Sequence, residues 1–185
     1  DALSDEHADV KKSAAKALVK ILGRASDNFH DLGDAPAKAV KALLKDLSDA
    51  DAGVKSSAAD ALGEILGQAS DNFHDLCDAA AKDVAAALAD ALSDEHADVK
   101  KSAAKALVKI LGRASDNFHD LGDAPAKAVK ALLKDLSDAD AGVKSSAADA
   151  LGEILGQASD NFHDLCDAAA KDVAAALADA LSDEH

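Results

Sequence analysis

The chain repeats itself. Residues 1–89 recur without a single change from Asp90 onward, and a third copy begins at Asp179 and runs to His185. Self-similarity at a fixed period is the signature of repeat architectures, in which each unit packs only on its neighbours. We therefore expect one repeat domain that spans residues 1–185.

Each 89-residue block contains two related halves, which we call type A and type B. Duplicated natural units drift apart, so perfect identity over 89 residues favours an idealised or engineered sequence. The type A units are 3–46 and 92–135, the type B units are 47–91 and 136–180, and a stub follows at 181–185.

The apolar spacing within a unit predicts helices, and no run of alternating β-branched residues predicts a strand. A long helix should end near Gly23, since helices commonly stop at glycine. A later helix has Pro36 in its first turn and Asp34 as its cap. The face expected to be buried on the long helix consists of Val10, Ala14, Ala17, Leu18 and Ile21, and that of the later helix of Val40, Leu43, Leu44 and Leu47.

An octet, ASDNFHDL, lies between these helices and occurs four times. It predicts a short helix capped by Ser26, which ends at Gly33 in type A and at Cys77 in type B. An ordered loop is the alternative, which leaves open whether a unit has two or three helices. His30 with its neighbouring carboxylates could suggest a metal site, but zinc needs three or four converging ligands. We therefore interpret the octet as structural and expect no metal, cofactor or catalytic residues.

Type A and type B units resemble armadillo repeats, and they are also similar to the related two-helix HEAT repeats. The stretch LSDEHADVKKSAAKALVKILGRASDNFHDLGDAPAKAVKALL, which begins at Leu3, carries the opening turn, the long helix and the later helix. The resemblance covers all four units and implies an all-α, right-handed solenoid with a concave groove that binds peptides or proteins. Armadillo proteins that bind basic targeting peptides carry a ladder of Trp and Asn in that groove. The corresponding positions here hold Lys16, Lys20, Asp60 and Glu64.

The two unit types differ most along one column of the long helix, at positions spaced four residues apart. The column is basic in type A and polar or acidic in type B. Neighbouring long helices lie about 8–10 Å apart, so basic and acidic columns should alternate. Two interpretations stay open: lateral ion pairs, worth about 0.2–1 kcal/mol each when exposed, or a charged groove for a peptide. The candidate residues of this charge ladder are Lys12, Lys16, Lys20, Arg24, Asp60, Glu64, Lys101, Lys105, Lys109, Arg113, Asp149 and Glu153.

Charge and composition limit the partners. The net charge of −15 disfavours nucleic acids and anionic membranes, because phosphates would be repelled. Unit 47–91 carries 2 basic and 9 acidic residues, so a bound partner should be basic. No apolar run approaches the ~20 residues of a membrane span, and we expect a soluble chain. Cys77 and Cys166 lie two units apart, beyond the ~7 Å limit for a disulfide, which predicts free thiols and suits a reducing compartment such as the cytoplasm.

The terminal units keep the apolar residues of internal ones, whereas repeat proteins normally end in units with a polar outer face. The end of one chain should therefore present to the start of another the interface that already occurs at 91/92. Our leading hypothesis is a non-catalytic designed repeat scaffold that associates head to tail with itself. The alternative is a module whose concave groove binds a basic protein or peptide. Enzymatic activity has no supporting residue set.

Overall fold

The computed structural model describes residues 2–24, 34–67, 74–117, 121–156 and 163–182. In these ranges every regular element is helical. The elements are the 3-10 helix η1 (Ala2–Ser4) and the α-helices α1 (Ala8–Arg24), α2 (Ala35–Asp46), α3 (Ala52–Gly67), α4 (His74–Ala91), α5 (Ala97–Asn117), α6 (Ala124–Asp135), α7 (Ala141–Gly156) and α8 (His163–Ser182).

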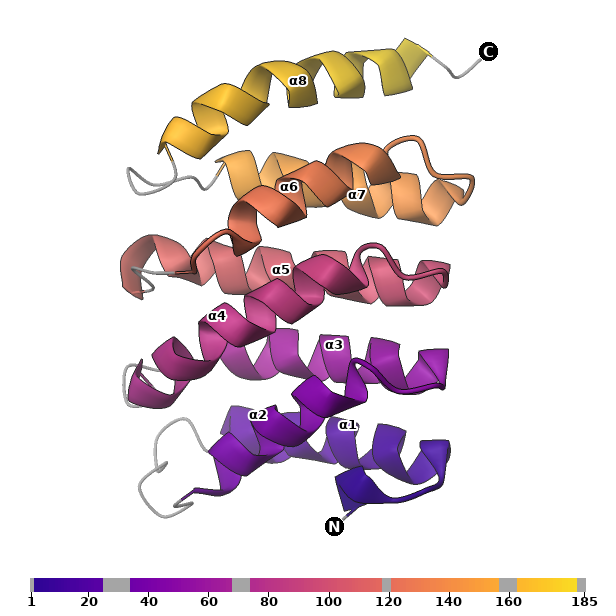
Figure 1. Cartoon of the computed structure of the whole chain (residues 1–185), viewed down its shortest axis with the longest axis vertical. Coiled ribbons are helices and arrows are strands. Elements are labelled where there is room, and N and C mark those ends of the chain that lie inside the picture. The colour runs from indigo at the N-terminus through magenta and orange to yellow at the C-terminus, as the bar shows by residue number, and fades with distance from the viewer. Residues whose placement is uncertain (1, 25–33, 68–73, 118–120, 157–162, 183–185) are drawn as a thin grey trace.

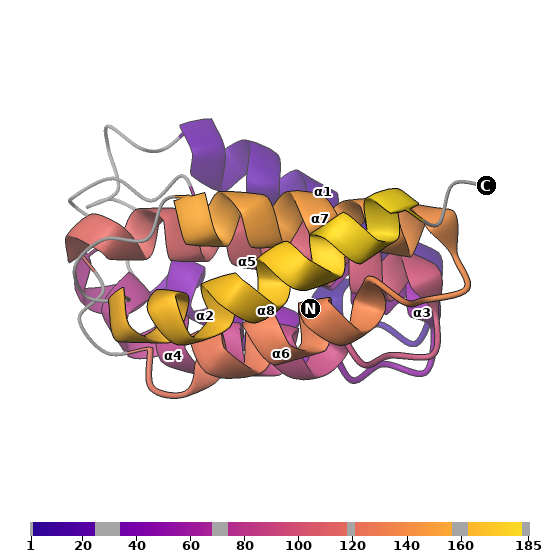
Figure 2. The same cartoon turned by 90° about the horizontal axis from the view of Figure 1, so that it is seen from above.

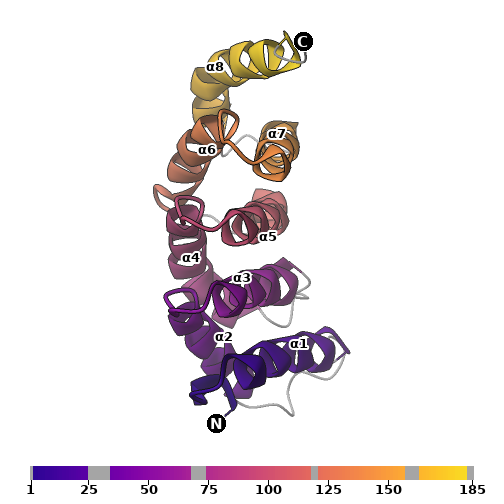
Figure 3. The same cartoon turned by 90° about the vertical axis from the view of Figure 1, so that its right-hand side faces the viewer.

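The helices form two layers (Figures 1 and 3). Helices α1, α3, α5 and α7 stack in one layer, and α2, α4, α6 and α8 stack in the other. The second layer bows outward in Figure 3, so the first lines the inner, concave side. Seen from above, the helices of each layer overlie one another, with the two termini at opposite ends of the stack (Figures 1 and 2). Each sequence unit thus contributes one helix to each layer.

Helix starts follow from local hydrogen bonds. The Asp51 carboxylate accepts the N–H of Val54 at 2.9 Å at the start of α3, which satisfies a donor that has no partner within the helix. Pro36 lies in the first turn of α2, as predicted. Asp34 holds the predicted cap position, but its side chain makes no cap hydrogen bond. Its carboxylate instead lies 2.8 Å from the ammonium of Lys38, one turn along the helix.

The predicted short helix ending at Cys77 is wrong for the type B unit. Helix α4 runs unbroken from His74 to Ala91, because the alanine-rich stretch after Cys77 contains no glycine or proline to stop it. Type A differs, since Gly122 adopts a positive φ of 60° just before α6. The long helix also passes its expected end: α5 continues through Gly112, the copy of Gly23, to Asn117. The first copy of the octet lies outside the described residues.

The core is a seam of Leu, Ile, Val and Ala between the layers. In α2, Val40 and Leu43 are buried as predicted and Leu44 is half-buried; Leu47, which caps the end of α2, is also buried as predicted. The predicted face of the long helix is fully buried in its second copy on α5. In the first copy, on α1, that prediction is wrong: Ile21 is 56% exposed, because no unit lies on its other side. None of the described helices is long and apolar enough to cross a membrane.

Candidate protein-interaction surfaces

The junction from a type B to a type A unit brings two backbones close together. A Cβ placed on Gly63 of α3 would lie 2.7 Å from the Cα and Cβ of Ala106 on α5. One turn later, a Cβ on Gly67 would lie 2.9 Å from the Cβ of Lys109. Real Cβ atoms do not approach other carbon atoms this closely, so the two glycines permit the contact. Helices α3 and α5 therefore pack through small residues.

The two junctions from type A to type B are more open. Each contains a recess of about 290 Å³ between adjacent long helices, α1 and α3 in one case and α5 and α7 in the other. The two recesses are equivalent copies, and each combines lysines from one helix with carboxylates from the next. Their linings are Lys16, Val19, Lys20, Ser57, Asp60, Ala61 and Glu64 in the first, and Lys105, Val108, Lys109, Ser146, Asp149, Ala150 and Glu153 in the second.

The charge ladder divides between these surfaces. Lys109 forms an ion pair with Glu64 across the B-to-A junction. Lys12 instead pairs with Asp9 of its own helix at 2.7 Å, and Lys101 does the same with Asp98 at 2.8 Å. The side chains of Arg24 and Arg113 lie outside those that the structure describes. The remaining candidates line the two recesses: Lys16, Lys20 and Asp60 the first, and Lys105, Asp149 and Glu153 the second.

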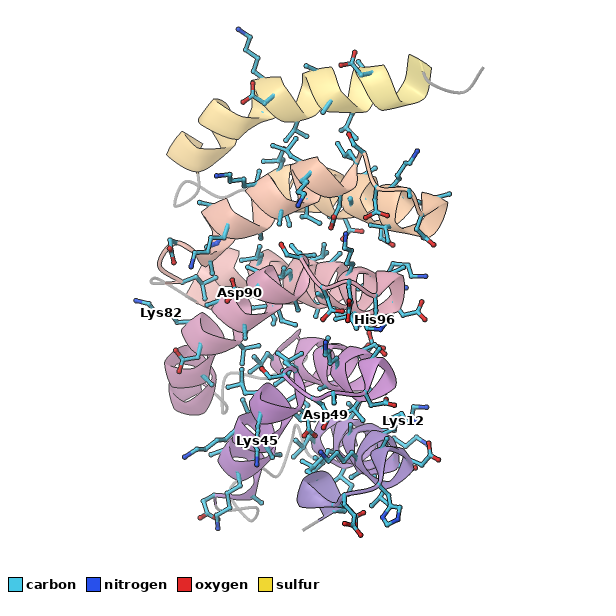
Figure 4. All side chains as sticks on the ribbon, turned by 45° about the vertical axis from the view of Figure 1, so that its right-hand side comes forward. Lys12, Lys45, Asp49, Lys82, Asp90 and His96 are labelled. Atoms are coloured by element: carbon cyan, nitrogen blue, oxygen red, sulfur yellow. The ribbon has the colours of Figure 1, made fainter. Side chains whose placement is uncertain are left out.

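A second set of ion pairs, which the sequence analysis missed, ties each unit to the next. A lysine in the first turns of a long helix reaches an aspartate in the turn that precedes the next long helix; Figure 4 labels one such aspartate, Asp49. We call these pairs the lysine–aspartate staples. The sequence signal is a lysine 38 or 39 residues before the aspartate of each Leu-Ser-Asp turn after the first. The described staples are Lys11–Asp49 at 2.6 Å, Lys55–Asp94 at 2.7 Å and Lys100–Asp138 at 2.6 Å.

The carboxyl group of Asp94 has a lowered pKa in its staple. Burial opposes ionisation of this carboxyl group, but hydrogen bonds from Lys55 and from the backbone N–H of His96 outweigh it and lower the pKa of Asp94 to about 2. Asp135 lies beside Lys100 at 3.0 Å in another staple. Burial is the largest influence there, and it raises the pKa of Asp135.

Metal ligation finds no support in the described part of the chain, where no group of three or more His, Cys, Asp or Glu side chains could hold an ion. The predictions for His30, Cys77 and Cys166 fall on side chains outside the described set.

The two ends of the stack present open surfaces. At the first unit, a recess of about 380 Å³ opens between η1, α1 and α2, lined by Leu3, Ala14, Leu18 and Ile21 among others. At the last unit, α7 presents Gly152, the copy of Gly63. A Cβ placed there would meet nothing within 4 Å. Both ends therefore expose groups that the internal B-to-A junction covers.

Comparison with known proteins gives structural matches alone: no family model matches the chain, and no curated protein matches it in sequence. One similar structure is an engineered protein solved by the Northeast Structural Genomics Consortium, at 26% identity and a TM-score of 0.66 over 95% of this chain. A computationally designed armadillo repeat protein for modular peptide recognition matches over 95% of this chain and 78% of its own, at 23% identity and a TM-score of 0.64. A designed armadillo repeat protein in complex with the peptide (KR)4 matches over 95% and 77%, at 22% identity and a TM-score of 0.61.

These matches confirm the predicted all-α solenoid and the resemblance to armadillo repeats. The chain spans 65% of the length of the first engineered protein. The handedness of the superhelix and the division into two identical pairs stay predictions. Over about 95% of its length, the chain has the fold of designed armadillo repeat proteins.

Proposed function

We propose that this chain is a non-catalytic, designed armadillo-type scaffold that associates head to tail. In this arrangement the last unit of one copy, with α7 and α8, packs on η1, α1 and α2 of the next. The contact is heterologous, so it grows into a filament or closes into a ring, depending on the rotation between copies.

One observation carries the proposal: the same helix face is open in one copy and covered in the other. Ile21 is 56% exposed on α1, whereas Ile110, its copy on α5, is 0% exposed. Val10 and Val99 show the same contrast, at 38% and 0%. The cover on α5 comes from a type B unit, and the chain ends in another type B unit. The surface that would bury Ile21 is thus present on every molecule.

The internal junction specifies the contacts of the proposed interface. Gly152 would lie against Ala17 of the next copy, as Gly63 lies against Ala106. Lys20 of the next copy would meet Glu153, as Lys109 meets Glu64. Burial of the two large apolar side chains, Val10 and Ile21, contributes about 1.5–3 kcal/mol each. The proposed association depends on this contribution.

Two single substitutions test the interface from opposite sides. Ile21→Asp places a charge on the N-terminal face, and Gly152→Leu fills the site of close approach on the C-terminal face. Each chain should stay monomeric in sedimentation velocity at concentrations where the parent chain grows in mass. A one-to-one mixture of the two should give a dimer and nothing larger, because each keeps one intact face.

Ala126→Asp, at an exposed site on α6, is the charge-matched control and should associate like the parent. A parent chain that stays monomeric at all concentrations refutes the proposal.

The twin recesses support a second candidate function, binding of a basic peptide. Each recess contains two carboxylates at its type B side, and the last type B unit repeats the net acidic composition of the first. A fluorescent (KR)4 peptide is a suitable probe, and its affinity should fall as salt screens the charges. Asp60→Asn with Glu64→Gln should weaken binding. A control that removes the same charge, Asp83→Asn with Asp172→Asn, changes exposed sites on α4 and α8 and should leave binding nearly unchanged. Equal losses in both variants would point to non-specific attraction.

A further inference from the structure

Seven residues, DALSDEH, occur three times: at 1–7, 90–96 and 179–185. We call each copy a heptad. The internal heptad contains the end of α4 and the turn into α5, and Figure 4 labels Asp90 and His96 within it. It is therefore an integral part of the B-to-A junction that the proposed end-to-end contact would reproduce.

The N-terminal heptad already has the conformation of the internal one. The Asp5 carboxylate accepts the N–H of His7 at 2.9 Å, and Asp94 accepts that of His96 at the same distance. Leu3 is 7% exposed, in close agreement with the 1% of its copy Leu92. Helix η1 contacts α1 and α2, and α4 contacts α5 and α6. In the free chain, residues 2–7 thus occupy the junction position on the first unit.

The described part of the C-terminal heptad, residues 179–182, differs from the internal copy. Helix α4 ends at Ala91, but α8 continues two residues beyond the equivalent Ala180, to Ser182. The backbone that should turn at a junction is still helical there. An end-to-end contact would therefore bring a second heptad to a position that the first already fills.

We propose that the N-terminal heptad is a built-in competitor that weakens head-to-tail association of this chain. The inference rests on the proposed function. An internal junction contains one heptad, whereas two docked copies would bring two, so one of them must leave. The competing group is residues 179–185 of the preceding copy. The partner is a second copy of the chain. Competition between the two heptads for one position lowers the affinity of the two copies for each other.

Trimmed chains test the competition. One variant lacks residues 1–7, and a second lacks 179–185; each then contains two whole 89-residue periods. Both should associate at a concentration about tenfold lower than the full chain, because no buried leucine has to be displaced. Sedimentation velocity measures the association, and circular dichroism checks that each chain is as helical as the parent.

A length control separates competition from shortening. Residues 1–7 are replaced by seven Gly and Ser residues, which cannot take the junction position, and this chain should associate like the trimmed ones. If a trimmed chain loses helicity, Leu3→Ser in the full chain serves instead, since it weakens the seat of the N-terminal heptad and should strengthen association. Equal association of the full and trimmed chains would overturn the competition and leave the proposed function standing. Absence of association in every chain would overturn both.

Discussion

Gly63 and Gly152 are copies with opposite surroundings. The first is buried against Ala106, and the second is open. Gly63→Ala should reduce the free energy of unfolding by about 1–3 kcal/mol, because the new Cβ overlaps backbone that cannot move away. Gly152→Ala should increase it by about 0.5–1 kcal/mol, since alanine is the better helix former.

The two variants have the same composition, so each is the matched control of the other. Urea unfolding followed by circular dichroism, at a concentration where the chain is monomeric, measures the difference. Equal effects at the two sites would contradict the close approach at Gly63.

Asp94 gives a prediction about pH. Its pKa of about 2 in the folded chain lies below the usual 3.8, so its ionised form stabilises the fold above about pH 4. This contribution is lost as the pH falls toward 2. Asp94→Asn should therefore cost about 1–3 kcal/mol at pH 7, because Lys55 loses a partner in a half-buried site. The difference from the parent should shrink as the pH approaches 2.

Asp98→Asn is the control for Asp94→Asn. Asp98 pairs with Lys101, but its side chain is 81% exposed. Exposed pairs of this kind contribute little, so the expected loss is much smaller than that at Asp94. Urea unfolding across the pH range measures both variants, and a pH-independent cost at Asp94 would contradict the lowered pKa.

At the level of single residues, the sequence predicted the buried faces of α2 and α5 but missed the staples. The charge ladder was visible because four positions recur at a spacing of four on one helix. Lys11 and Asp49 lie 38 residues apart, and only the stacking distance between units shows that they meet. A helical period cannot reveal that distance.

Helix lengths depend on which residues follow the octet. The long helices, the later helices and their apolar faces follow from spacing alone. The break expected at Cys77 does not occur, since alanines after it continue the helix, whereas Gly122 and Pro125 separate α5 from α6. Burial differs between copies of one element, because it depends on the neighbour rather than on the sequence of the helix. That dependence is the property on which the proposed association rests.

Hydrogen exchange should separate the two copies of the long helix. Residues 8–22 and 97–111 have the same sequence, so peptides from them have the same mass. Helix α5 packs on both α3 and α7, but among the other long helices α1 packs on α3 alone. Mass spectrometry should thus show two isotopic envelopes for this peptide, a slow one from α5 and a fast one from α1.

Association should slow the hydrogen exchange of the α1 peptide until its envelope approaches that of the α5 peptide, because the next copy then covers α1. The slow envelope, which comes from α5, should change little and serves as the internal control, because α5 already packs on α3 and α7 within the chain. A single envelope in dilute monomer would contradict the difference in packing between α1 and α5.

On the scale of the whole molecule, the units form a stack, and in stacks of repeats stability is approximately a sum over units and the junctions between them. The chain contains one B-to-A junction, with the close contact at Gly63, and two A-to-B junctions, each with a recess. Inserting a further 89-residue block after residue 89 adds one junction of each kind and leaves both ends unchanged. The urea midpoint of this longer chain should therefore rise, because internal junctions become more numerous relative to the open ends. Its head-to-tail affinity should equal that of the parent, since the same two faces meet. Sedimentation and urea unfolding of the two chains test these outcomes together, and a longer chain with a changed affinity would show that the contact extends beyond the terminal units.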